Sequence, residues 1–158
     1  MSIAELTGYI VRVHHSYVKL NAPMIANYLL KVATKHGERF PFMIEVYTLF
    51  CDLMEELYEH MEKEEEVLFP NLVASNDQKW RNTDYFSLVE PFEHEHEQSG
   101  SIMERISKLT NNYNVPEQAC TTFRLALESL RAFQEDLHKH VHLENNVLFP
   151  KAASISLS

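Results

Sequence analysis

The segment HMEKEEEVLFP, His60–Pro70, returns 80 residues later as HVHLENNVLFP, His140–Pro150. Six positions match at identical offsets, so both segments read His-x-x-x-Glu, two residues and then Val-Leu-Phe-Pro. Chance is a poor explanation for a match of this kind. Two interpretations remain. Either a helical hairpin is duplicated and the matching residues only pack, or the matching residues also share a function at the centre of the molecule.

The composition is that of one globular domain of ordinary size. The chain has 158 residues, of which 45% are hydrophobic, and this is enough to bury a substantial core. Its 3 Gly and 6 Pro are too few for a turn-rich all-β protein. The net charge of -9 argues against nucleic acid or an anionic membrane as a partner, because both select basic surfaces. No apolar run approaches the roughly 20 residues that span a bilayer.

The expected location is the cytoplasm. The N-terminal segment MSIAELTGYI lacks the basic, apolar and small-residue regions of a secretory signal. The 2 cysteines, Cys51 and Cys120, are too few for a disulfide framework, and each lies in an apolar helical context. We therefore expect buried, free thiols in a reducing compartment.

Apolar residues recur at helical spacing in four long segments. The pattern predicts helices over residues 3–35, 42–73, 85–113 and 116–150, with Pro116 opening the last one. The polar stretch at residues 74–84 is predicted to be the loop between the second and third helices. Four helices of similar length with short connections predict an all-α fold, an up-down-up-down four-helix bundle.

The repeated histidine and glutamate are expected to face the core. Residues i and i+4 differ by only about 40° around a helix, so His60 and Glu64 share a face, as do His140 and Glu144. On both helices this face continues the apolar stripe. The stripes comprise Leu53, Leu57, His60, Glu64 and Val67 on one helix, and Leu130, Phe133, Leu137, His140, Glu144 and Leu148 on the other. Buried imidazole and carboxylate groups are costly unless something pairs with them.

The other two helices carry one inward histidine each. His15 lies between Val11 and Val18 on the stripe of the first helix, and His96 lies on the stripe of the third. His14 receives no assignment, because the first helix is apolar around much of its circumference. Three further histidines share their faces with polar residues and are expected to be exposed: His94, His138 and His142.

Six residues therefore meet in one layer of the bundle. At 1.5 Å per residue, their levels all fall roughly 15–20 Å from the same end of an antiparallel bundle. A dry network of hydrogen bonds is one explanation for such a layer, and a metal site is the better one. The candidate ligands are His15, His60, Glu64, His96, His140 and Glu144.

The donor set favours a pair of iron or manganese ions. It holds more donors than the four of a closed zinc site, and none is a thiolate. Imidazoles do not suit Ca²⁺ or Mg²⁺, which take oxygen ligands. Mixed imidazole and carboxylate donors suit iron or manganese, and two carboxylates in a set of six suit two ions.

An acidic run lies within the first motif and comprises Glu62, Glu64, Glu65 and Glu66. A path for iron uptake is one interpretation of these carboxylates. A solvated helix face is the better interpretation for every member except Glu64.

The sequence resembles the hemerythrin-like (HHE cation-binding) domain over almost its whole length. The resemblance rests on HMEKEEEVLFP, EHEQSG, PEQACTTFR and above all HLENNVLFP, and it is closest to the repair-of-iron-centres proteins of the YtfE/ScdA type. It implies a hemerythrin-like bundle that holds two non-haem iron ions, bridged by an oxo group and by Glu64 and Glu144. The four candidate histidines would be terminal ligands.

The resemblance raises two further points. It marks His36 as a candidate ligand, but a straight helix places His36 ~31 Å beyond His15. We therefore leave His36 out of the site and expect it to cap the helix or to lie at the mouth of a channel. Full-length members of the family carry an N-terminal domain with a cysteine pair. We expect residues 1–158 to be a single di-iron domain without it.

Two classes of function fit these expectations. The first is stress-linked di-iron chemistry, in which the protein handles nitric oxide or peroxide, with NO reduction as an enzymatic version, and gives up iron to damaged iron–sulfur proteins. The second is reversible binding or sensing of O₂, as in hemerythrins. Plain iron storage is a third interpretation, and it needs a shell of many subunits that the sequence does not announce.

Overall fold

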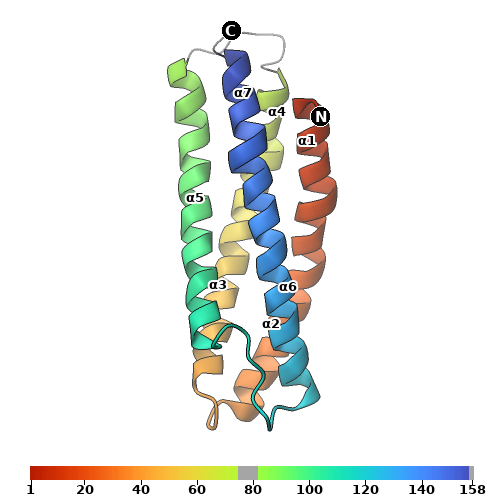
Figure 1. Ribbon diagram of the computed structural model, residues 1–158, viewed down its shortest axis with the longest axis vertical. Coiled ribbons are helices and arrows are strands. Elements are labelled where there is room, and N and C mark those ends of the chain that lie inside the picture. Colours follow the sequence, from red (N-terminus) through yellow and green to blue (C-terminus); the bar gives the residue numbers. More distant parts are fainter. Residues whose placement is uncertain (75–81, 157–158) are drawn as a thin grey trace.

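The computed structural model describes residues 1–74 and 82–156, which form four long helical rods packed side by side (Figure 1). The described residues include no strand. Neighbouring rods run in opposite directions, and both ends of the chain lie at the same end of the bundle. The predicted all-α, up-down-up-down four-helix bundle is therefore confirmed. Most of the predicted loop at residues 74–84 lies outside the described residues.

Three of the rods are built from several helical elements. The first rod comprises α1 (Ile3–Tyr9), the π-helix η1 (Ile10–His15) and α2 (Ser16–His36). The second comprises α3 (Phe42–Lys63), the π-helix η2 (Glu64–Leu68) and α4 (Phe69–Ala74). The third is α5 (Asn82–Leu109). The fourth comprises α6 (Thr121–Leu143), the π-helix η3 (Glu144–Leu148) and α7 (Phe149–Ser156).

The connection between the third and fourth rods is longer than predicted. α5 ends at Leu109 because residues 111–113 adopt φ angles of 52°, 56° and 62°. Such left-handed conformations cannot continue a right-handed helix. α6 begins at Thr121 instead of Pro116, after an extended Cys120 at its N-cap. The predicted ends of these two helices, at residues 113 and 116, are therefore wrong.

A π-helical segment interrupts three of the rods at the level of the predicted ligand layer. A π turn holds one extra residue, so the face that follows it shifts by one position. Leu68 is consequently buried and Val67 is 48% exposed, and the prediction that the second stripe continues to Val67 is wrong. In η1, both His14 and the adjacent His15 are buried.

The polar layer lies between two apolar clusters of described side chains. The larger cluster fills the long part of the bundle and includes Phe50, Leu57 and Phe133. The smaller lies at the end that carries both termini and includes Leu68 and Phe149. On each rod the candidate ligands stand between members of the two clusters, so close packing holds the layer from both sides.

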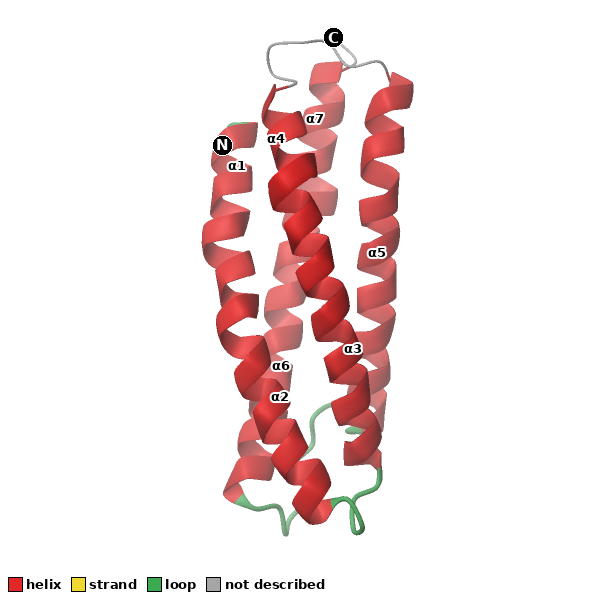
Figure 2. Cartoon of the chain, turned by 180° about the vertical axis from the view of Figure 1, so that it is seen from behind, coloured by secondary structure: helices red, strands yellow, loops and turns green. Residues whose placement is uncertain are grey.

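The sequence repeat is also a structural repeat. The π-helices η2 and η3 begin at the two motif glutamates, and α4 and α7 begin at the two motif phenylalanines. The second rod stands in front of the fourth in Figure 2, and the first rod packs against both of them. None of the described helices is both long and apolar enough to cross a membrane.

Candidate metal centre

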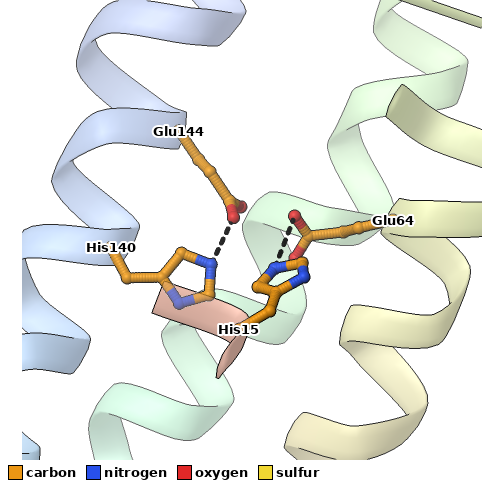
Figure 3. A group of neighbouring side chains, drawn as sticks. All are labelled: His15, Glu64, His140 and Glu144. Carbon is orange, nitrogen blue, oxygen red and sulfur yellow. Dashed lines mark hydrogen bonds and ion pairs between the residues drawn. The ribbon is translucent and has the colours of Figure 1, made fainter. Parts of the chain in front are cut away.

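The polar layer brings the six predicted ligand residues together, and all of them are buried. They form two overlapping groups of four, and within each group the ligand atoms lie within 4.8 Å of one another. His15 and His140 belong to one group, His60 and His96 belong to the other, and Glu64 and Glu144 belong to both. Figure 3 shows the side chains of the first group, which come from three rods and point toward one another. The arrangement suits two neighbouring cations that share two carboxylates.

Glu144 lies at the centre of the inward-facing imidazoles. Its Oε1 is 2.5 Å from His140 Nε2, and its Oε2 is 2.8 Å from His96 Nε2. The Nε2 atoms of His60 and His96 are only 3.0 Å apart. Donor atoms from different rods thus converge on one small space through the same ring nitrogen, Nε2.

Several of the inward atoms make no hydrogen bond with any described residue. These are both carboxylate oxygens of Glu64, Oε2 of Glu144 and Nε2 of His15. Glu64 Oε2 is 3.9 Å from His15 Nε2. Two contacts are close but lack hydrogen-bond geometry, namely Glu64 Oε1 with His60 and Glu144 Oε2 with His96. A buried carboxylate without compensating bonds is strongly unfavourable. Because cations between the two carboxylates would satisfy these atoms together, the residues present fit bound metal ions.

The two shared carboxylates differ in their affinity for protons. Burial raises the pKa of Glu64 well above its usual value, and the neighbouring Glu144 raises it further. Burial acts on the pKa of Glu144 in the same direction, but the imidazoles around it, His140 first, hold that pKa well below its usual value. Burial, followed by the effect of His140, lowers the pKa of His15 to about 4. The His15 ring is therefore neutral at pH 7 and can offer a lone pair to a metal.

Three of the four candidate ligand histidines also form a hydrogen bond through Nδ1, on the side of the ring that faces away from the layer. The bonds run from His15 Nδ1 to Glu65 Oε2 at 3.1 Å, from His60 Nδ1 to Glu95 Oε2 at 3.1 Å, and from His96 Nδ1 to Asn145 Oδ1 at 2.8 Å. We call Glu65, Glu95 and Asn145 the outer partners. Since an ionised carboxylate only accepts, the ring must donate through Nδ1. This leaves the lone pair of Nε2 directed into the layer, which is the form that a metal requires.

The outer partners differ from what the sequence predicted. Glu65 is not part of a solvated helix face, because its side chain is only 28% exposed and it bonds to both His15 and Lys19. The sequence analysis singles out neither Glu95 nor Asn145. The sequence repeat could have identified two of the three outer partners, because Glu65 and Asn145 each directly follow a motif glutamate.

His14, which the sequence left unassigned, also reaches the layer. It is only 4% exposed, and its Nδ1 lies 3.0 Å from Asp136 Oδ1. Its ring stacks on that of His140, with centroids 5.5 Å apart and planes 15° from parallel. His14 therefore touches a candidate ligand without belonging to either group of four.

The remaining histidines lie elsewhere. His94, His138 and His142 are exposed, as predicted. His36 is the last residue of α2, 21 residues beyond His15, and its ring lies against Phe123. A continuous α2 of that length separates the two rings by ~31 Å, so His36 is remote from the layer.

The two cysteines are free, as predicted, but they are not fully buried. Cys51 and Cys120 are both only partly covered. Cys120 is at the N-cap of α6, just outside the helix in which its apolar neighbours placed it. The prediction of buried thiols is wrong in this respect.

Comparison with known proteins gives two findings. Residues 8–152 match the model of the hemerythrin HHE cation binding domain. The chain is also similar to proteins named iron-sulfur cluster repair protein. ScdA of Staphylococcus epidermidis is 30% identical over 97% of this chain and 68% of the relative. ScdA of Staphylococcus haemolyticus is 33% identical over 93% and 66%, and YtfE of Escherichia coli is 31% identical over 95% and 66%. The chain thus spans about two thirds of the length of these relatives.

Proposed function

The chain belongs to the hemerythrin HHE cation-binding family, and from this premise we propose that it is a non-haem di-iron protein of iron–sulfur cluster repair. It acts under nitric oxide or oxidative stress, donates iron to apo or damaged iron–sulfur proteins and handles small diatomic ligands at its metal centre. The observation that carries the proposal is the pair of overlapping four-residue groups that share both glutamates.

The six residues have distinct roles in this proposal. His15 and His140 hold one iron ion, and His60 and His96 hold the other. Glu64 and Glu144 would be shared by the two ions, and an oxo group would complete the bridge between them. The bound pair supplies redox chemistry and a binding position for NO or O₂. The residues of the chain orient the ligands, exclude water and keep both carboxylates within reach of both ions.

The donor set supports iron over the alternatives. Calcium and magnesium take oxygen donors, and four imidazoles among the six donors favour iron over manganese, which prefers a larger share of oxygen. A closed zinc site uses four ligands and leaves two of these six without a role. The relatives named above carry iron–sulfur cluster repair in their names, which agrees with iron as the metal.

Iron donation is favoured over reversible O₂ binding by two observations. The similar curated proteins are named for cluster repair. The layer is also close to solvent, because the outer partners Glu65 and Glu95 are each 28% exposed and are held by the exposed Lys19 and Lys63. An ion in the layer is therefore separated from water by little more than one imidazole and one carboxylate. The proposal treats residues 1–158 as one di-iron domain, and the free thiols support a reducing compartment such as the cytoplasm.

The proposal is tested by measuring iron transfer and O₂ binding on one reduced sample. We expect the protein to deliver iron to an apo iron–sulfur acceptor, and to do so faster when reduced, because ferrous iron binds carboxylate donors less strongly than ferric iron. A reduced protein that keeps its iron and gives a reversible O₂ spectrum would contradict the repair function and support a hemerythrin-like carrier.

A further inference from the structure

One of the four candidate ligand histidines has no outer partner. His140 Nδ1 is buried and makes no hydrogen bond with any described residue. The other three rings donate through Nδ1 to Glu65, Glu95 or Asn145. When an imidazole binds a metal through Nε2, its proton lies on Nδ1, and a buried N–H needs an acceptor. A metal-bound His140 therefore requires an acceptor that its neighbours must supply.

An unused acceptor lies one helical turn away. Asp136 precedes His140 by four residues on α6, so the two side chains share a face. Its Oδ1 pairs with His14 Nδ1 at 3.0 Å, while its Oδ2 is buried and makes no hydrogen bond with any described residue. A carboxylate can accept from two donors at once, one at each oxygen.

The stacking of His14 on His140 supports this pairing. The two rings are nearly parallel, with an angle of 15° between their planes and 5.5 Å between their centroids. Parallel rings can present their Nδ1 atoms to the two oxygens of a single carboxylate. His14 already uses one of these oxygens, and the other is the buried Oδ2.

The repeat gives an independent argument. On the other side of the layer, His60 donates to Glu95, the residue directly before ligand His96. The residue directly before ligand His15 is His14. His14 uses its Nδ1 to bind Asp136 and offers no carboxylate to His140. On this side of the layer, α6 itself carries the carboxylate oxygen that has no hydrogen-bond partner among the described residues, Asp136 Oδ2.

We propose that Asp136, held in place by His14, is the positioning residue of ligand His140. Its Oδ2 accepts from His140 Nδ1, directly or through one bound water, and so keeps His140 Nε2 directed at the ion. This assignment rests on the proposed di-iron centre. It completes a set of outer acceptors for all four imidazoles: Glu65, Glu95, Asn145 and Asp136.

The test compares Asp136→Asn with Glu135→Gln, which neutralises an exposed carboxylate at the preceding position of α6. Each protein is loaded with ⁵⁷Fe, and iron release to a chelator is followed together with the Mössbauer spectrum. We expect Asp136→Asn to release one iron about 10-fold faster and to change one of the two iron signals, since loss of an outer partner weakens metal binding. Glu135→Gln should behave like the wild type.

A compensating variant separates positioning from simple packing. His14→Glu places a carboxylate where the repeat has Glu95, so the double variant His14→Glu/Asp136→Asn should recover slow iron release. The melting temperature of each chelator-treated protein reports the stability of the fold without metal. Unchanged iron release in Asp136→Asn would overturn the assignment. Faster release of both irons together with a lower melting temperature, and no recovery in the double variant, would also overturn it.

The iron content of the wild type tests the proposed function separately from the Asp136 assignment. If the wild type holds no iron pair, the proposed function fails, whereas the Asp136 assignment is then decided by Co²⁺ affinity. A weaker Co²⁺ affinity in Asp136→Asn than in Glu135→Gln supports the assignment, and equal affinities contradict it.

Discussion

The two halves of the chain, residues 1–74 and 82–156, contribute the same ligands but surround them differently. Each half gives the layer two histidines and one glutamate. His15 stacks on Phe69, and its counterpart His96 stacks on Phe149 in the same way. The outer partners do not match.

The outer partners of the two halves differ at two pairs of corresponding positions. Glu65 accepts from His15, whereas its counterpart Asn145 accepts from His96. Glu95 accepts from His60, whereas the corresponding position on the other side is His14, which stacks on His140. An imidazole that donates its Nδ1 hydrogen to a carboxylate is a stronger metal ligand at Nε2 than one that donates it to an amide. The repeat thus places two similar groups of four candidate ligands in one layer, and the residues around them make the two groups different.

The largest effect is expected at the residues that both positions share. Glu64→Leu and Glu144→Leu each remove a carboxylate that belongs to both groups of four, and each should lower the iron content to about one ion per chain or fewer. The remaining iron should pass to a chelator faster than in the wild type. Elemental analysis measures both variants, with Glu66→Leu on the exposed face as the matched control. If one variant keeps two irons while the other loses one, the glutamates of the two halves are not equivalent. Two retained irons also show that the replaced glutamate is not needed by both ions.

The next effect concerns one candidate ligand histidine from each of the two groups of four. His96→Ala and His140→Ala should lower the iron content sharply, because each removes a terminal imidazole. The exposed neighbours give the controls, His94→Ala and His138→Ala, whose iron content should stay near that of the wild type. The opposite pattern would show that the buried faces of α5 and α6 have been misassigned.

A smaller effect is expected from exchanging the outer partners. Glu65→Gln replaces a carboxylate by an amide and should speed the release of one iron about 10-fold. Asn145→Asp makes the opposite change beside His96 and should slow the release of the other iron. Both are followed by stopped-flow transfer to a chelator, with the exposed Glu62→Gln as the control. If both substitutions change the release rate in the same direction, acceptor charge is not what distinguishes the two positions.

The smallest effect is the release of a proton on metal binding. Burial raises the pKa of Glu64 well above its usual value, so this carboxyl binds a proton more readily than an ordinary glutamate in the chelator-treated protein, whereas His15, with a pKa of about 4, holds none at pH 7. Anaerobic addition of ferrous iron should displace protons from the layer, and the apparent affinity should rise with pH. A pH indicator in weak buffer measures the release. An affinity that does not change with pH would contradict the assigned protonation.

The sequence predicted the burial of the two His-Glu pairs because its signal is local. His60 and Glu64 are four residues apart, as are His140 and Glu144, so helical period alone places each pair on one face. The π-helices have no comparable local signal, and for this reason the inward position of Leu68 and the burial of His14 were not predicted. Glu95 was missed for another reason. It lies 35 residues from His60, so its role depends on how α3 and α5 pack.

The central claim is that six residues of the chain hold a pair of iron ions. The most direct test is the iron content, ⁵⁷Fe Mössbauer spectrum and near-ultraviolet absorption of the wild-type protein prepared in air. The account predicts about two iron ions per chain, two related iron signals from a coupled ferric pair, and strong near-ultraviolet charge-transfer absorption. A single tightly bound zinc ion with a featureless spectrum would contradict it.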